Sequence, residues 1–453
     1  MSRDPILTLI VSQSGIRGVY GESLTIDLVI KLTKAFVKLW NVKSVIIGRD
    51  TRPSGNPIKH AVLTALTDLG CRVYDVEVQP TPLILWTCRK LGVDGAIIIS
   101  ASHNPPEWNA LKLAFRGVFL DEDDVSKLVK ANGGAMKGYE SAHVHTLDPL
   151  RDYVNEALKH LDVETVKRRK IKVVIDPGGG AGFRSTPMLL RVLGCKVVTI
   201  NSAPGVFSRD IEPTPSSLEM LSKAVKAYDA DVGFAHDADA NRLVCVTESG
   251  EVLYEDYGLA IASLHVLERR RGPLVVSVAS SMMFKWIAEQ FNVELFWSQI
   301  GEVNVVKEIV RRNAPIGGEG SSGGIIPAFF NLARDGVFGA ALIIEALASR
   351  DCRISDIVDS LPRYYQARDS IYCEIGRAKA VMKKLMDELR GMQLDLTDGI
   401  KVWFDDGWVL IRQSRTEPKI RILCESTSQV RVRELLEEYV AKVRDVIFKS
   451  NVR

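Results

Sequence analysis

The sequence predicts an α/β protein with mostly parallel sheets, followed by a smaller α+β region. Three observations support this prediction. Short apolar runs alternate with helix-length amphipathic segments through most of the 453 residues, a pattern typical of repeated strand–helix–strand units. Each apolar run ends in a cluster of Gly, Asp or Ser. Near residue 365 the alternation gives way to closely spaced strands between two helices.

The elements are expected in the following order along the chain. Helices are predicted over residues 26–40 and 216–228, and strands over 44–48, 96–100, 172–176, 196–201, 231–236 and 274–278. The last region is expected to hold a helix over 375–389, strands over 400–404, 408–413 and 420–425, and a final helix over 429–448. The turn at residues 405–407 (DDG) predicts that the first two of these strands form a hairpin.

Breaks in this pattern indicate the domain organisation. Length alone favours about three domains, but three breaks divide the chain into four parts. They are a charged helical connector at 148–169, a break near 254–258 and another near 361–368. We therefore expect domains over residues 1–150, 151–255, 256–365 and 366–453.

Composition excludes several classes of protein. The chain has 59 Lys and Arg against 56 Asp and Glu, a net charge of +3, which is too small to favour a nucleic-acid partner. No apolar stretch reaches the ~20 residues of a membrane span, and the apolar run near the N-terminus is too short for a signal peptide. The seven Cys form no C-x-x-C pair, so zinc is not expected. Scattered free cysteines favour a reducing cytoplasm as the location.

The first chemical cluster is residues 100–106 (SASHNPP), directly after a predicted strand. A serine in such a loop can act as a nucleophile or carry a phosphate if a base or a metal lies nearby. The alternative is a turn held by Ser and Asn side chains. Lys112, ten residues beyond Ser102, is either a proton-transfer group or a solvated lysine.

The second cluster is residues 237–242 (DADANR), after the predicted strand 231–236. Oxygen ligands at alternate positions can converge on a hard cation such as Mg²⁺. The spacing to Glu248 also fits a calcium-binding EF-hand loop, but Arg242 replaces the required glycine and residues 243–247 resemble a strand. An acidic turn without metal is the remaining alternative.

The third cluster is residues 317–324 (GGEGSSGG), which contains G-x-G-x-x-G. We expect neither a strand before it nor a helix after it, so a dinucleotide site is not predicted. A loop that offers Glu319 and Ser321 to a polyhydroxylated ligand is favoured. The other glycine-rich turn, residues 176–182, lacks the GK[ST] of a nucleotide-binding loop and is expected to allow close helix–strand packing.

The fourth cluster is residues 412–419 (RQSRTEPK), between two predicted strands of the last region. Arginine, hydroxyl groups and loop N–H groups together can hold a phosphate, because arginine donates paired hydrogen bonds. An exposed basic hairpin is the alternative.

In this order, the four clusters resemble the α-D-phosphohexomutase family. The match begins at residues 14–18 (SGIRG), continues through 48–52 (GRDTR), 176–182, 212–215 (EPTP) and 334–336 (RDG), and covers nearly the whole chain. The resemblance implies three α/β domains and a smaller α+β domain around a central cleft. It also implies Mg²⁺-dependent interconversion of hexose 1- and 6-phosphates through a phosphoserine and a hexose 1,6-bisphosphate. It leaves open whether the sugar is mannose, glucose or glucosamine, and whether the protein is a monomer or a homodimer.

The resemblance also implies roles for individual residues. Ser102 matches the phosphate carrier, and His103 in the same loop is a candidate catalytic residue. The implied Mg²⁺ ligands are Asp237, Asp239, Asn241 and a phosphate oxygen on Ser102. Arg242, a further catalytic candidate, matches the arginine that follows these ligands. Arg17 and Lys112 match residues near the transferring phosphoryl group, and Lys112 is expected to move the proton. Sugar hydroxyls would be held by Glu319 and Ser321, and the non-reacting phosphate by Arg412, Ser414 and Thr416, with Arg415 as an additional donor.

Two departures from the family pattern bear on function. Asn241 stands where Asp is usual, which predicts weaker Mg²⁺ binding, and Glu302 occupies a variable position where it is a hypothetical second acid/base. Two rival functions stay open at this point. One is a hydrolase that admits water to the phosphoserine, and the other is a sugar-phosphate binder without activity.

Overall fold

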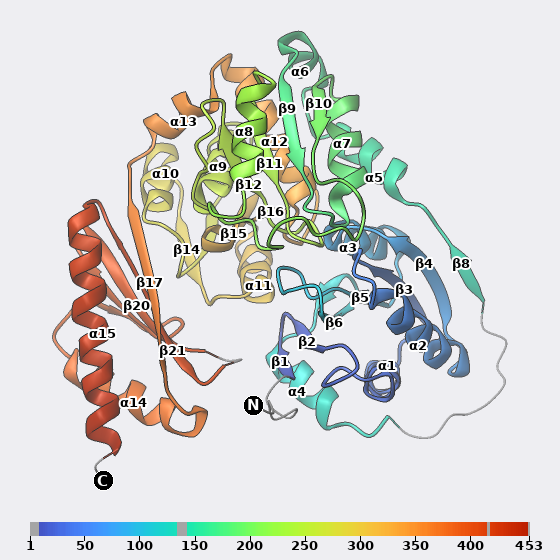
Figure 1. Ribbon diagram of the computed structural model, residues 1–453, viewed down its shortest axis with the longest axis horizontal. Helices are drawn as coiled ribbons and strands as arrows, with labels where there is room; N and C mark the ends of the chain where they lie inside the picture. Colours follow the sequence, from blue (N-terminus) through green and yellow to red (C-terminus); the bar gives the residue numbers. More distant parts are fainter. Residues whose placement is uncertain (1–8, 134–142, 415–416, 452–453) are drawn as a thin grey trace.

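The computed structural model describes residues 9–133, 143–414 and 417–451. It contains three α/β units and a smaller α+β unit, as predicted, and Figure 1 shows the four sheets arranged in chain order around the middle of the molecule. No helix within the described ranges is long and apolar enough to cross a membrane. The proposed boundaries after residues 150, 255 and 365 stay a prediction.

The first unit is built on an eight-stranded mixed sheet of order β1-β2-β6-β5-β3-β4-β8, with β7 paired to β6. Its elements are β1 (Ile10–Ser12), β2 (Gly15–Val19), α1 (Ile26–Leu39), β3 (Ser44–Arg49), α2 (Gly55–Asp68), β4 (Arg72–Val78), α3 (Thr81–Leu91), β5 (Gly95–Ile99), β6 (Trp108–Phe115), β7 (Val118–Phe119), α4 (Glu122–Lys130) and β8 (Val144–Thr146). Strand β5 is buried along its whole length, which explains its continuous apolar sequence. Helix α1 begins where the Thr25 hydroxyl accepts a hydrogen bond from the Leu28 N–H.

The second and third units repeat one arrangement of four strands. The second has the sheet order β10-β9-β11-β12 and the third β14-β13-β15-β16, and in each only the last pair is antiparallel. The second contains α5 (Leu150–Leu158), α6 (Val163–Arg169), β9 (Lys172–Asp176), α7 (Gly182–Val192), β10 (Lys196–Thr199), α8 (Glu219–Ala227), β11 (Val232–Ala235) and β12 (Val244–Thr247). The third contains α9 (Asp256–Arg269), β13 (Leu274–Ser277), α10 (Met283–Phe291), β14 (Leu295–Ser298), α11 (Glu302–Arg312), β15 (Ile316–Glu319), a 3₁₀ turn (Gly320–Ser322), β16 (Gly324–Pro327), α12 (Gly336–Arg350) and α13 (Ile354–Ser360).

The same four-strand arrangement recurs inside the first sheet as β4-β3-β5-β6. In all three units the third strand of the repeat turns directly into an antiparallel neighbour. The connecting loops are residues 100–107, 236–243 and 320–323, which carry the first, second and third chemical clusters. Topology therefore places these clusters at equivalent positions, at the carboxyl ends of strands where α/β sheets bind their ligands.

The fourth unit is an antiparallel sheet of order β17-β21-β20-β19-β18 with two helices. Its elements are β17 (Tyr365–Tyr372), α14 (Ile375–Glu388), β18 (Leu394–Asp395), β19 (Ile400–Phe404), β20 (Gly407–Gln413), β21 (Lys419–Ser426) and α15 (Gln429–Asn451). The predicted hairpin is confirmed, with Phe404 opposite Gly407. The fourth cluster lies between β20 and β21.

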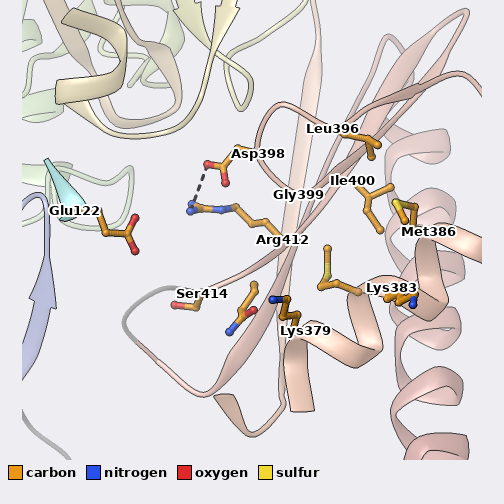
Figure 2. Close-up of a pocket in the computed structure, with 12 residues that line it drawn as sticks. Glu122, Lys379, Lys383, Met386, Leu396, Asp398, Gly399, Ile400, Arg412 and Ser414 are labelled. Carbon is orange, nitrogen blue, oxygen red and sulfur yellow. Dashed lines mark ion pairs between the residues drawn. The ribbon is translucent and has the colours of Figure 1, made fainter. Parts of the chain in front are cut away.

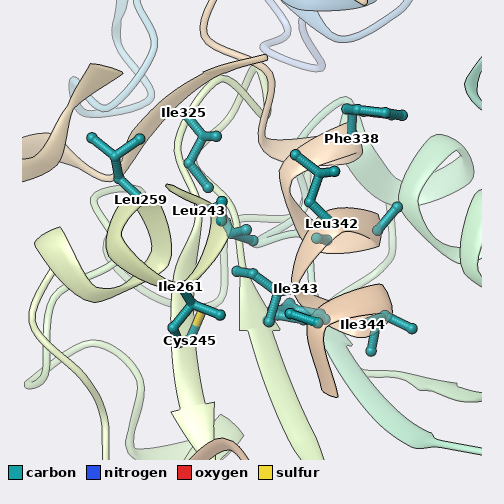
Figure 3. Close-up of a cluster of buried hydrophobic side chains, with 14 of the residues drawn as sticks. Leu243, Cys245, Leu259, Ile261, Ile325, Phe338, Leu342, Ile343 and Ile344 are labelled. Atoms are coloured by element: carbon teal, nitrogen blue, oxygen red, sulfur yellow. The ribbon is translucent and has the colours of Figure 1, made fainter. Parts of the chain in front are cut away.

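One hydrophobic core joins the second and third units. Helix α12 is buried on nearly every side, and Figure 3 shows its Phe338 and Leu342 among side chains of β12, α9 and β16. A polar contact continues this junction, because the buried Tyr153 hydroxyl lies 2.8 Å from both carboxylate oxygens of Asp335. Asp335 in turn accepts a hydrogen bond from the Phe338 N–H at the start of α12. The second and third units therefore pack as one body.

The contact between the third and fourth units centres on a buried lysine. Lys401 is 1% exposed and donates a hydrogen bond to the Val278 carbonyl across the interface at 2.7 Å. Its ammonium lies 4.0–4.4 Å from the ring centres of Trp297, Trp403 and Trp408, close enough for cation–π attraction. Burial, partly offset by Glu425, lowers the pKa of Lys401 to about 7. A buried lysine in an apolar setting therefore connects the last unit to the third.

The structure corrects two expectations from sequence. A strand, β15, does precede the third cluster, although a 3₁₀ turn and β16 follow it where a dinucleotide site would need a helix. Its sequence, IGGE, has too few apolar side chains to be recognised as a strand. The charged connector at 148–169 forms two helices, α5 and α6, rather than one stretch.

Candidate active site

Ser102 lies in the loop after β5 with a positive φ of 54°, a conformation that non-glycine residues adopt rarely and often at functional sites. A buried network holds it there. The Ser102 N–H donates to the Ser100 hydroxyl at 3.0 Å, and that hydroxyl donates to Asp50 at 2.7 Å. Arg52 pairs with Asp50 and donates to the Ser102 carbonyl at 2.9 Å. Residues 48–52, which the sequence marked only as a matching flank, thus shape the serine loop.

The acidic turn after β11 meets this loop. The Ser102 hydroxyl donates to Asp237 Oδ2 at 2.5 Å, and Lys112 Nζ lies 2.5 Å from Asp239 Oδ2. The Thr81 hydroxyl also donates to Asp239, and the Thr81 N–H donates to the Asp239 carbonyl. These contacts bring β5, β6, α3 and β11 to one point. The EF-hand alternative is excluded, because strand β12 follows the turn.

Unpartnered oxygens at the turn fit a metal cation. Asp237, Asp239 and Asn241 are each at most 1% exposed. Asp239 Oδ1 and both polar atoms of the Asn241 side chain have no hydrogen-bond partner among the described residues, which is costly unless something binds them. Two carboxylates and an amide oxygen are hard ligands of the type that Mg²⁺ prefers. The residues present therefore fit this cation.

The two carboxylates differ in their proton affinity. Burial and the neighbouring Asp239 raise the pKa of Asp237 to about 6. Although burial acts in the same direction on Asp239, the Lys112 ammonium lowers the pKa of Asp239 below its usual range. The pair thus keeps one firmly ionised carboxylate beside Lys112 and a more basic carboxylate beside the Ser102 hydroxyl.

Arginine side chains surround the serine on its open side. Arg17 Nη1 donates to Asn104 Oδ1 at 2.9 Å, and Arg242 Nη1 lies 2.7 Å from Glu212 Oε1. The Nε of Arg17 is buried without a partner among the described residues. Burial and then Arg242 lower the pKa of Arg17 to about 10, so it stays protonated at neutral pH. Such a group of cations is suited to a dianionic phosphate.

His103 is placed beside Arg242, whose Nη2 lies 2.9 Å from His103 Nδ1. Because the guanidinium can only donate, Nδ1 accepts. Burial, followed by the charges of Arg242 and Arg17, holds the pKa of His103 far below its usual range. In this arrangement His103 is a neutral acceptor that orients Arg242.

Glu319 ends β15 and is held on both oxygens. Its Oε1 accepts the Gly301 N–H at 2.6 Å, and its Oε2 lies 3.2 Å from Arg334 Nη1. Arg334 also binds both oxygens of Glu302 at 3.0 Å, one through its backbone N–H and one through Nε. Glu302, the hypothetical second acid/base, thus supports Arg334, and Arg334 supports Glu319.

The fourth cluster is described in part. Arg412 is the penultimate residue of β20, and its Nη2 lies 3.5 Å from Asp398 Oδ2. Figure 2 shows the two side chains pointing toward one another, with Glu122 of the first unit opposite. A cavity of about 550 Å³ adjoins Arg412 and Ser414 on the side of α14. Arg415 and Thr416 lie outside the described residues.

One cleft of about 760 Å³ brings most of these groups together. The predicted residues that line it are Arg17, Ser102, His103, Arg242, Glu319, Ser321, Arg412 and Ser414. Lys112, Asp237, Asp239 and Asn241 are buried; Asp237 accepts from Ser102, Lys112 pairs with Asp239, and Asn241 lies in the same turn. Every predicted site residue that the structure describes therefore lines the cleft, belongs to the acidic turn or pairs with a residue of that turn. Sequence reasoning missed Gln13, Arg368 and Arg421, which also line the cleft, and Asp398; only Gln13 had a signal, as the neighbour of the matching SGIRG segment.

Comparisons with known proteins agree with this geometry. Models of phosphoglucomutase/phosphomannomutase match in order: the alpha/beta/alpha domains I, II and III over residues 8–133, 151–250 and 254–365, and the C-terminal domain over 371–442. A "Phosphoglucomutase/phosphomannomutase" of Thermococcus kodakarensis is 38% identical over 93% of this chain and 96% of its own. A "Probable phosphoglucosamine mutase" of Pyrococcus abyssi is 34% identical over 97% of this chain and 98% of its own.

A solved structure of a phosphoglucomutase/phosphomannomutase family protein from Burkholderia thailandensis superposes with a TM-score of 0.86 and 25% identity, covering 98% of both chains. The fold and the site together define a phosphoryl-transfer enzyme that acts on phosphosugars. The chain belongs to the phosphoglucomutase/phosphomannomutase family, the α-D-phosphohexomutases, and is a phosphohexomutase that interconverts hexose 1- and 6-phosphates. The sequence-based prediction of the family is confirmed.

Proposed function

We propose that Ser102 carries the phosphate that is transferred, and that glucose and mannose phosphates are the substrates. The observation that supports this most is the position of the Ser102 hydroxyl, 2.5 Å from Asp237 and beside Arg17 and Arg242. A phosphoserine brings about −1.5 to −2 charges at neutral pH, which the nearby cations offset. The higher identity to the relative named for glucose and mannose favours these sugars over glucosamine.

The proposed metal is Mg²⁺, held by Asp237, Asp239, Asn241 and an oxygen of the phosphate on Ser102. When bound, it would neutralise charge on the transferring phosphoryl group. The protein's own groups do the rest of the work. Arg17 and Arg242 bind phosphoryl oxygens, and the buried wall around Ser102 excludes water, which favours transfer to sugar over hydrolysis.

The proposed reaction is two phosphoryl transfers in opposite directions. A hydroxyl of the bound sugar phosphate attacks phosphorus, the bond from phosphorus to Ser102 Oγ breaks, and a hexose 1,6-bisphosphate forms. The sugar hydroxyl loses one proton and Ser102 Oγ takes up one proton, so the step is balanced. Lys112 is the proposed group that relays this proton. The bisphosphate then turns around, and its other phosphate returns to Ser102.

Two anchors would hold the sugar in both orientations. Arg412 and Ser414, with Arg415 and Thr416, bind the phosphate that is not reacting, because arginine reads phosphate by paired hydrogen bonds. Glu319 and Ser321 bind hydroxyl groups that both orientations present. Phosphoryl transfer depends mainly on positioning and charge stabilisation, so these anchors contribute to the rate as well as to affinity.

An assay with three sugars tests the proposal. Glucose, mannose and glucosamine 1-phosphates are offered separately with Mg²⁺ and a trace of hexose 1,6-bisphosphate, and 6-phosphates are followed by phosphorus NMR. We expect glucose and mannose phosphates to convert fastest; a faster glucosamine reaction would reverse the sugar assignment, and inorganic phosphate released in step with substrate loss would indicate a hydrolase. Intact mass should show one phosphate on the wild type and none on Ser102→Ala, with Ser216→Ala, at an exposed serine, as the matched control. A fully active Ser102→Ala would refute the role of Ser102.

A further inference from the structure

The turn at Ile300 and Gly301, between β14 and α11, is bonded to three parts of the molecule. The Ile300 N–H donates to Asp398 Oδ2 of the fourth unit at 3.1 Å. The Ile300 carbonyl accepts a hydrogen bond from Gln13 Nε2 of the first unit at 3.1 Å. The Gly301 N–H donates to Glu319 Oε1 of its own unit at 2.6 Å. Two successive backbone amides thus connect the last unit to the hydroxyl-binding glutamate.

Asp398 connects this turn to the phosphate anchor. The same oxygen that accepts the Ile300 N–H, Oδ2, lies 3.5 Å from Arg412 Nη2. The side chains of Asp398 and Arg412 are only 10% and 12% exposed, so solvent screens this contact less than a surface ion pair. Figure 2 shows Arg412 extending from the sheet toward Asp398, away from the cavity beside Lys383 and Met386. A shift of Arg412 would therefore move Asp398 Oδ2, the oxygen that accepts the Ile300 N–H.

The turn itself has little freedom to absorb such a shift. Gly301 has a φ of 119°, which favours glycine, and a Cβ there would overlap the side-chain amide of Gln13. At the other end, Glu319 is only 8% exposed and is fixed on its second oxygen by Arg334 at 3.2 Å. The path from Arg412 through Asp398, Ile300 and Gly301 to Glu319 is a continuous series of polar contacts of 2.6–3.5 Å joined by the backbone of Ile300.

We propose that Asp398 is a positioning residue that fixes the separation between Arg412 and Glu319 through the Ile300–Gly301 turn. The inference rests on the proposed roles of Arg412 in phosphate binding and Glu319 in hydroxyl binding. An enzyme that binds its sugar in two orientations needs both anchors at the same spacing each time, because phosphoryl transfer depends steeply on alignment. The turn links the two anchors although they belong to different units.

The test is a double-mutant cycle between Asp398 and Glu319. Asp398→Asn keeps an acceptor for the Ile300 N–H but removes the charge that faces Arg412, and Glu319→Gln weakens the other end. We expect Asp398→Asn to raise KM for glucose 1-phosphate about tenfold, with a change in kcat of less than about threefold. If the two residues act in one network, their effects on kcat/KM are not independent. The fold-loss of kcat/KM in the double variant should then be at least about threefold smaller than the product of the two single fold-losses.

Controls separate this inference from the proposed function. Asp387→Asn removes an exposed carboxylate of α14 that pairs with Arg390 beyond the end of the helix, and it should leave kcat and KM unchanged. If both single variants lose activity but their effects multiply independently, the link is refuted while the proposed anchors stand. If Glu319→Gln is as active as wild type, the proposed role of Glu319 and the link both fail.

A second variant covers the case that Asp398→Asn does not fold, as judged by circular dichroism. Gln13→Ala releases the Ile300 carbonyl from the first unit without touching Arg412 or Glu319. It should also raise KM and couple to Glu319→Gln in the same cycle. Additivity within error in that cycle would overturn the proposal as well.

Discussion

Replacement of Asn241 by aspartate is expected to tighten Mg²⁺ binding and to destabilise the metal-free protein. Asn241 is fully buried, and neither polar atom of its side chain has a partner within the described ranges. The substitution exchanges an amide for a carboxylate of nearly the same shape, so packing changes little. What changes is the charge of the turn that also carries Asp237 and Asp239.

The magnitude follows from this setting. One unit charge about 4 Å from another contributes about 4 kcal/mol at an effective dielectric constant of about 20. Part of this attraction to the cation is lost, because a third carboxylate competes for protons and for Lys112. We therefore expect Mg²⁺ to bind the variant roughly 10- to 100-fold more tightly, about 1.4–2.8 kcal/mol. Without metal, a buried carboxylate without its counterion should lower stability by up to about 3–5 kcal/mol.

Two measurements check both parts of this expectation. Isothermal titration with Mg²⁺ gives the affinity, and thermal unfolding with and without Mg²⁺ gives the stability, which metal should restore by linkage. Asn155→Asp, at an exposed position of α5, is the matched control and should change neither. Equal or tighter Mg²⁺ binding by the wild type would refute the reasoning, since the added charge would then not face the cation.

Three further predictions concern the scaffold of the site. Burial lowers the pKa of Lys401 to about 7 in the folded state, against the usual 10.5, so the unfolded chain binds more protons between these two values. The free energy of unfolding should therefore rise with pH from about 7 to about 10, by at most about 1.4 kcal/mol per pH unit. Lys401→Met should flatten this rise in chemical unfolding, and an unchanged slope would contradict the assignment. Tyr153→Phe leaves the buried Asp335 without its hydroxyl partner and should cost about 1–3 kcal/mol of unfolding free energy, measured in urea; a neutral effect would show that the contact contributes nothing. In Gly180→Ala the new Cβ would lie 2.7 Å from Ala238 Cα, so the acidic turn must move, and Mg²⁺ affinity should fall more than overall stability; the opposite order would argue against this account.

Much of the fold follows from local patterns in the sequence. Strand β9 has the predicted bounds because three apolar residues lie between Lys172 and Asp176, and β5 differs from prediction by one residue at each end. Strand β15 was missed because IGGE has no such pattern. It is a strand because β13 and β16 bond to it on both sides, which is a tertiary effect that overrides weak local propensity.

For the site, too, the sequence indicated the residues that lie in local motifs but not those whose contacts depend on tertiary packing. Motif residues such as Ser102, Asp237 and Glu319 are found where the four clusters placed them, next to the cleft. Residues that act by holding others were not foreseen. Asp398 and Glu302 bind partners 98 and 32 residues away, at Ile300 and Arg334. Such pairings depend on how whole units pack, and no local sequence pattern encodes them.

The three tryptophans around Lys401 have a consequence for measurement. Trp297 belongs to the third unit, whereas Trp403 and Trp408 belong to the fourth, and all three face one ammonium group. Indole emission depends on nearby charges and on exposure to water, so separation of the two units would change the emission of three of the seven tryptophans at once. The unlabelled protein thus contains an optical reporter of the distance between its last two units. Stopped-flow fluorescence can follow that distance during turnover without any engineered probe.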